Sequence, residues 1–202
     1  MRGIFIRHGE STGNAGLPSH DLALIELTEL GRTQAQRVAH AWREAPTLIV
    51  TSPFLRTQQT AAPTIARFPG VPVEVWPIEE FTYLQPARWK DTSRADRMPH
   101  LEQYWGRADP HYVDGDGAES FATLLRRADA ALTRLAALPD DALVYAFSHG
   151  QFMQAVRALV TQAELDERGK MQNFWRKDEP MIANVEQVRL ARSASGWQLL
   201  PP

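Results

Sequence analysis

The 202-residue sequence contains no cysteine and no long hydrophobic run. Without cysteine there is no disulfide, no thiolate nucleophile and no cysteine-ligated metal site. A membrane-spanning helix needs about 20 consecutive apolar residues, and the run Ile4–Ile6 near the first residue is also too short for a signal peptide. We therefore expect a cytoplasmic protein without a membrane segment.

An excess of charge of either sign is also lacking. The chain carries 22 basic and 24 acidic residues, which gives a net charge of -2. This balance provides no global electrostatic basis for binding nucleic acid or an anionic membrane, so any affinity for anions must be local. A chain of 202 residues with 44% hydrophobic residues can bury one core but is short for two. We predict a single domain over residues 1–202.

Short apolar runs alternate with helical stripes in the N-terminal half. The predicted elements there are strands over 3–7 and 47–51 and helices over 32–42 and 57–68. Thr28 is a plausible N-cap of the first helix, and Pro63 should start or kink the second. A third strand over 71–76 contains Pro72, which favours an edge position. This β-α-β-α order predicts a parallel sheet.

Predicted helices and strands also alternate in the C-terminal half. Ser120 can cap a helix that runs to Leu138. The arginines off its apolar face are expected to be solvated: Arg126, Arg127 and Arg134. The other predicted elements are a strand over 142–147, a helix over 151–160 and short strands over 185–190 and 197–200.

Two histidines, His8 and His149, each follow directly on a predicted strand and each precede a glycine. Ligands of parallel α/β sheets bind beyond the carboxyl ends of the strands, so both imidazoles are expected in one site. Arg7 adjoins His8, and Arg56 follows the second strand to the same edge. Guanidinium and imidazole N–H groups suit a phosphate dianion, and a neutral imidazole can attack phosphorus. These residues predict phosphoryl transfer through a phosphorylated His8.

This chemistry requires no metal and no cofactor. The other histidines lack metal-ligand spacing and are expected in surface or capping roles: His20, His40, His100 and His111. For Arg56 and His149 the alternative to catalysis is a hydrogen bond at a helix N-terminus.

The run Arg7-His8-Gly9-Glu10-Ser11-Thr12, followed by Asn14, resembles the signature of the histidine phosphatase superfamily, also called the phosphoglycerate mutase-like family. Further similar motifs follow in the same order at 27–35, 51–60, 117–121 and 148–150. The resemblance thus spans roughly residues 3–160. It implies a three-layer α/β/α sandwich with a mostly parallel central sheet and a phosphoric monoester hydrolase of the histidine acid phosphatase type.

The resemblance also implies which residues act. His8 would carry the phosphoryl group, and the phosphate pocket would comprise Arg7, Asn14, Arg56, His149 and Gly150. Asn14 could instead be a turn residue among nearby glycines. A proton donor is implied after the third strand, at Glu80 or else Glu79, because an alkoxide leaving group needs a proton.

We expect a phosphomonoesterase that acts on a small phosphorylated metabolite. One alternative is a mutase, which returns the phosphoryl group to another hydroxyl of a bound sugar acid. The resemblance implies that a mutase of this family would carry Gln or a Trp-Asn ending near the first motif. This chain has Glu10 and the run Thr12-Gly13-Asn14 there, which favours the phosphatase. The other alternative is a non-catalytic phosphate-binding or scaffold protein. The expected partner is the small substrate, not nucleic acid or a membrane, and a homo-oligomer is compatible with the sequence.

Residues 84–117 lose the regular pattern and are too long for a bare loop in a compact domain. We predict a helix around 94–106 and a cover over the active site. Several aromatic and basic side chains of this segment either pack in the core or contact the non-phosphate part of a substrate. They are Trp89, Lys90, Arg94, Arg97 and Arg107.

Overall fold

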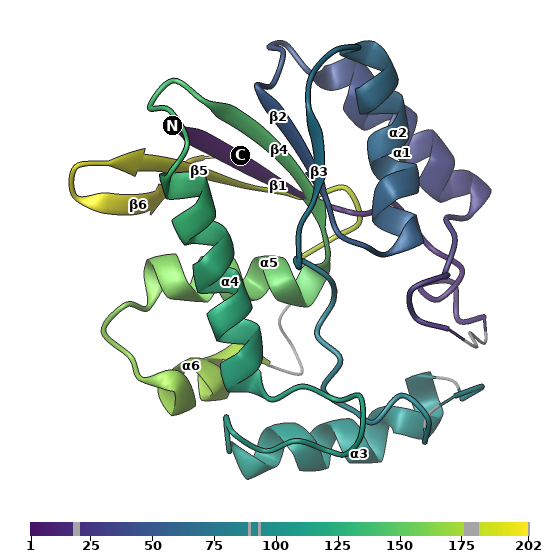
Figure 1. Cartoon of the computed structure of the whole chain (residues 1–202). Helices are drawn as coiled ribbons and strands as arrows, with labels where there is room; N and C mark the ends of the chain where they lie inside the picture. Colours follow the sequence, from purple (N-terminus) through teal and green to yellow (C-terminus); the bar gives the residue numbers. More distant parts are fainter. Residues whose placement is uncertain (18–20, 89, 93, 176–181, 202) are drawn as a thin grey trace.

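The computed structural model describes residues 1–17, 21–88, 90–92, 94–175 and 182–201, which surround a six-stranded sheet (Figure 1). The strands are β1 (Arg2–Arg7), β2 (Leu48–Thr51), β3 (Val73–Val75), β4 (Leu143–Ser148), β5 (Gln187–Ser193) and β6 (Gly196–Leu199). Their order is β3-β2-β4-β1-β5-β6. The first four pair in parallel and the last two antiparallel, which confirms the mostly parallel sheet. β3 lies at the edge, as Pro72 predicted.

Helices cover both faces of the sheet, which confirms the three-layer fold (Figure 1). One face carries α1 (Glu29–Ala41) and α2 (Leu55–Arg67), and the other carries α4 (Phe121–Ala136) and α5 (Gly150–Thr161). Neighbouring residues of β1 point to opposite faces. Ile6 packs in the cluster with Val38 and Ala61 of the first layer, whereas Phe5 packs with Leu124 and Phe152 of the second.

Two further helices lie away from the sheet, toward the side where α4 begins (Figure 1). They are α3 (Arg94–Arg107) and α6 (Glu167–Phe174). The first confirms the helix predicted around 94–106. The sequence pattern did not predict α6, because this short helix is mainly polar, although Asp166 caps it by accepting a hydrogen bond from the Gly169 amide. No helix in the described part of the chain has the length and apolar character to cross a bilayer.

Local signals at the helix starts were mostly confirmed. The Thr28 and Ser120 side chains accept hydrogen bonds from the amides of Gly31 and Thr123, as N-caps do. Pro63 does not start α2, which begins at Leu55 and continues past it to Arg67. One proline inside a helix is tolerated here because α2 is packed against α1 and the sheet.

The prediction of a solvated Arg127 was wrong. Its guanidinium is mostly buried, 2.5 Å from a Glu119 carboxylate oxygen and 3.7 Å from Glu79. It also donates to the Pro77 and Glu79 carbonyls. The segment after β3 crosses this side of α4, so Arg127 ties α4 to the residues that precede Glu80.

Candidate active site

The two predicted histidines meet at the carboxyl ends of adjacent strands. Because Arg7 pairs with Ser148 in the parallel β1–β4 ladder, the next residues, His8 and His149, leave the sheet side by side. The His8 amide donates to the Ser148 carbonyl at 3.0 Å. The two rings lie edge to face with centroids 5.1 Å apart, and both are buried.

The hydrogen bonds of His8 identify its tautomer. Nδ1 lies 2.7 Å from the Gly9 carbonyl oxygen, which can only accept, so Nδ1 carries the hydrogen. The Arg56 Nε–H donates to Nε2 at 3.2 Å, so Nε2 carries the lone pair. Burial, followed by the positive charge of Arg56, lowers the pKa of His8 well below its ordinary 6.5. At neutral pH His8 is therefore an uncharged imidazole with Nε2 as its basic atom.

Two guanidinium groups flank this imidazole. Arg56 is 6% exposed and donates to the Leu22 carbonyl at 2.7 Å. Burial lowers the pKa of Arg56 from 12.5 to about 10, which leaves it charged at neutral pH. Arg7 donates to the Ile182 carbonyl at 2.5 Å, and its buried Nε has no hydrogen-bonding partner among the described residues. A Cβ at Gly150 would lie 3.4 Å from this Nε, so the start of α5 packs closely on Arg7.

His149 has one nitrogen engaged by the protein. Its Nε2 lies 2.8 Å from the Ser52 hydroxyl, whereas the buried Nδ1 has no partner within the described part of the chain. Ser52 is in turn 2.8 Å from the Thr57 hydroxyl, and the Phe54 ring packs edge-on against the imidazole. When Ser52 donates to Nε2, the hydrogen of a neutral His149 sits on Nδ1, which can then donate to an anionic ligand.

Ser52 is a site residue to which the sequence motif alone assigned no role. We expect Ser52→Ala to lower kcat/KM by about tenfold or more, because His149 Nε2 loses its hydrogen-bonding partner and the tautomer is no longer set. Steady-state kinetics with an aryl phosphate measures this effect. Ser195→Ala, in the exposed turn before β6, is the matched control, and equal activities of the two variants would contradict the role of Ser52.

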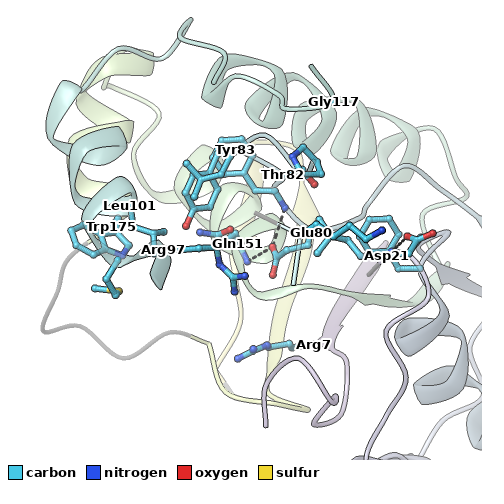
Figure 2. A pocket seen from close by; sticks show the side chains of 18 residues that line it. Arg7, Asp21, Glu80, Thr82, Tyr83, Arg97, Leu101, Gly117, Gln151 and Trp175 are labelled. Atoms are coloured by element: carbon cyan, nitrogen blue, oxygen red, sulfur yellow. Dashed lines mark hydrogen bonds between the residues drawn. The ribbon is translucent and has the colours of Figure 1, made fainter. Parts of the chain in front are cut away.

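The two candidate acids point in different directions. Glu80 lines a large pocket, and its Oε1 accepts hydrogen bonds from the Phe81 amide at 3.1 Å and the Gln151 amide at 2.9 Å (Figure 2). Glu79 instead faces Arg127 beneath α4. The amides that hold Glu80 come from its own loop and from the first turn of α5, so its carboxylate faces the strand ends.

Asn14 lies in the loop after β1 and is exposed. Its side-chain oxygen accepts hydrogen bonds from the Ser11 hydroxyl at 3.0 Å and from Asn184 Nδ2 at 3.2 Å. Asn184 Nδ2 also donates to the His8 carbonyl at 2.9 Å. Asn184 was missed by sequence reasoning, because nothing in the pattern before β5 indicates that this segment returns to β1.

Two glycines bring the loop after His8 close to the start of α1. A Cβ at Gly31 would overlap the Glu10 carbonyl oxygen, and one at Gly9 would lie 2.6 Å from the Gly31 carbonyl oxygen. The Gly9 amide donates to Thr60 of α2 at 3.0 Å. These contacts require glycine and hold the backbone on both sides of the imidazole.

The buried histidines predict a pH dependence of stability. Burial, followed by Arg56, lowers the pKa of both His8 and His149 well below 6.5. As the pH falls through about 6.5, the unfolded chain takes up protons that the folded chain does not, so stability is lost on the acid side. We expect each histidine to contribute a slope of up to about 1.4 kcal/mol per pH unit. Denaturant unfolding at pH 7, 6 and 5 should show a shallower slope for His149→Asn, and an unchanged slope would contradict the prediction.

The other predicted residues that the structure describes lie partly in the adjoining pocket and partly on the surface. Among the described residues, no three His, Asp or Glu side chains are grouped as a metal site. His40 is exposed on α1, and His111 lies 3.3 Å from Glu167. Lys90 and Arg97 line the pocket near Glu80, whereas Arg107 lies over the Tyr112 ring. His20, Trp89 and the Arg94 side chain lie outside what the structure describes.

A family model for the histidine phosphatase superfamily (branch 1) matches residues 4–179, and the chain belongs to this superfamily. The resemblance inferred from the motifs is thereby confirmed. A metal-independent phosphoserine phosphatase of Arabidopsis thaliana is 28% identical over 176 residues, covering 84% of this chain and 72% of that protein.

Solved structures share the fold over nearly the whole chain. A structure named mycobacterial hydrolase 1 has a TM-score of 0.77 and 25% identity, covering 99% of this chain and 96% of its own. A mycobacterial glucosyl-3-phosphoglycerate phosphatase complexed with VO3 has a TM-score of 0.75 and 24% identity, covering 98% and 96%. The latter similarity concerns the fold alone.

Proposed function

We propose that the protein is a phosphomonoesterase that hydrolyses a small phosphorylated metabolite through a phosphohistidine on His8. The observation that supports this most directly is the tautomer of His8, with its lone pair on Nε2 facing the Arg56 guanidinium. A buried neutral imidazole next to two cations is suited to attack phosphorus in a bound dianion. The family and the curated phosphoserine phosphatase relative support the same class of reaction.

In the proposed first step, the phosphoryl group binds at the ends of β1 and β4. The Arg7 Nε–H and the His149 Nδ1–H, which lack partners among the described residues, would donate to its oxygens. Arg56 would shift its Nε–H from His8 Nε2 to a phosphoryl oxygen and so free the lone pair. The Nε2–P bond then forms as the ester P–O bond breaks.

Glu80 is the proposed proton donor, because its carboxylate faces the pocket while Glu79 faces Arg127. It would protonate the leaving oxygen as the alcohol departs. Once deprotonated, it would accept a proton from the water that attacks phosphohistidine, releasing phosphate and restoring neutral His8. This chemistry is that of a phosphoric monoester hydrolase of the histidine acid phosphatase type.

We also propose that residues 84–117 form a cover over the site within one domain. Support comes from α3 and its flanking loops, which contribute several side chains to the pocket that begins at Arg7 and Glu80. Asn14 and Gly150 are proposed to shape the phosphate pocket through the loop after β1 and the start of α5. The cytoplasmic location and the homo-oligomer stay predictions.

Rapid quenching with an aryl phosphate labelled on phosphorus tests the intermediate. We expect acid-labile, base-stable label on the wild-type protein and none on His8→Asn. If the wild type neither labels nor releases phosphate although it binds phosphate, the protein is a phosphate-binding module and the proposal is wrong.

A mutase would share the first half of this reaction. Incubation with an excess of a phosphosugar acid separates the two, because a phosphatase releases inorganic phosphate whereas a mutase returns an isomerised phosphate ester. An isomerised product with little free phosphate would contradict the hydrolase proposal.

A further inference from the structure

A pocket of about 740 Å³ leads away from the proposed phosphate site. Figure 2 shows Glu80 at its centre, Arg7 below it, Asp21 on one side, and Leu101 and Trp175 on the other. This volume lies in the range of pockets that hold ligands of drug size. An amino acid such as serine would fill only a small part of it.

The wall distant from Asp21 is mainly apolar and aromatic. More than half of the lining residues are apolar or aromatic, and Tyr83, Met98, Leu101 and Trp175 are among them. Burial of an apolar ligand surface against such a wall favours binding in proportion to the area that it removes from water. A small, fully polar ligand gains nothing from this part of the pocket.

Buried aromatic rings of the core pack against the aromatic residues that line the pocket. The Tyr83 ring lies 4.9 Å from Tyr104 and 5.5 Å from Trp105 between centroids. The Trp175 ring stacks on the Trp105 ring, with 6.4 Å between the centroids and an interplanar angle of 8°. Tyr104 and Trp105 are 2% and 7% exposed and belong to the main core cluster. The wall is therefore preformed and loses little entropy when a ligand ring packs on it.

Two cationic side chains in the same pocket suit a different class of ligand, a small phosphorylated acid. Arg97, whose Nη1 donates to the Thr92 carbonyl at 2.9 Å, lies beside Gln151 in Figure 2, and Lys90 also lines the pocket. Such cations could hold the carboxylate of a small phosphorylated acid. They could equally pack over an aromatic ring of the ligand. The extent and rigidity of the aromatic wall favour the ring.

We propose that the substrate of this enzyme is the phosphomonoester of an alcohol with a large aromatic body, which packs against the wall that Tyr83, Leu101 and Trp175 form. This assignment rests on the proposed phosphatase function and specifies its substrate class. Tyr83, Leu101 and Trp175 are the residues that determine specificity.

A panel of phosphates of primary alcohols tests the proposal, because their leaving groups have similar chemistry. The probes are ethyl phosphate, phosphoserine, 2-phenylethyl phosphate and 2-(naphthyl)ethyl phosphate, with 3-phosphoglycerate as the small acidic competitor. We expect kcat/KM to rise from ethyl phosphate through the phenyl to the naphthyl compound. For the naphthyl compound it should be at least about tenfold higher than for phosphoserine or 3-phosphoglycerate.

Two variants distinguish a contribution of the wall to substrate specificity from a general effect on activity. Trp175→Leu and Leu101→Asn should each lower the ratio of kcat/KM for the naphthyl compound over ethyl phosphate by about fivefold or more. Trp197→Leu replaces another partly buried tryptophan, on β6 and away from the pocket, and should leave this ratio unchanged.

The outcomes distinguish the two proposals. If phosphoserine or 3-phosphoglycerate is hydrolysed at least as well as the naphthyl compound, the aromatic assignment is wrong while the phosphatase function stands. An unchanged ratio in both wall variants also overturns the assignment. If no phosphate is released from any probe, the proposed function itself fails.

Discussion

Replacing His8 with asparagine is expected to lower kcat/KM by at least about 10⁴-fold and to leave the protein folded. The loss is this large because, among the described residues, no other imidazole at the site offers an unengaged lone pair. His149 is adjacent, but its Nε2 is engaged by Ser52. Stopped-flow or discontinuous phosphate-release assays cover the range needed, and circular dichroism checks the fold.

His40→Asn is the matched control for this change. His40 is exposed on α1 and its Nδ1 contacts the Gln36 carbonyl within the helix, so its loss should change kcat/KM by less than about twofold. A folded His8→Asn protein with more than about one per cent of wild-type activity would show that phosphoryl transfer does not pass through this imidazole.

Glu80→Gln is expected to lower kcat/KM for an alkyl phosphate by about 10² to 10⁴-fold, because the alkoxide then leaves without a proton. For 4-nitrophenyl phosphate, whose leaving group needs no proton, the loss in kcat/KM should be less than about tenfold. The contrast between the two substrates separates loss of a general acid from loss of binding or fold.

Glu79→Gln serves as the neighbouring control, since this carboxylate faces Arg127 beneath α4. It should affect stability more than catalysis and should treat both substrates alike. A loss in Glu79→Gln that depends on the leaving group, with none in Glu80→Gln, would reverse the assignment of the acid.

Much of the site was predictable because its parts carry local signals. A short apolar run that ends in Arg7-His8-Gly9 and another that ends in Ser148-His149-Gly150 indicate strands with polar residues at their carboxyl ends. In a parallel sheet those ends share one edge, so convergence follows from topology alone. Arg56 follows β2 by the same logic. The central strand pair β1–β4 confirms this convergence.

Other features could not be predicted, because they depend on packing between distant segments. Arg127 stands on the side of α4 expected to face solvent, yet the chain after β3 covers it with Glu79 and Glu119. Asn184 reaches the His8 carbonyl only because β5 pairs antiparallel to β1. Nothing in the local sequence around either residue indicates these contacts.

The sequence by itself determined the superfamily, the mostly parallel sheet and the pairing of His8 with two arginines, because strand ends and short motifs act over a few residues. Only the tertiary structure decided the His8 tautomer, the partner of His149, the opposite directions of Glu79 and Glu80, and the aromatic wall of the pocket. Each of these depends on hydrogen-bond geometry or on side chains that meet from distant segments. The local motifs thus predict the phosphate chemistry, whereas the proposed selection of the alcohol depends on how α3 comes together with the segments around Tyr83 and Trp175.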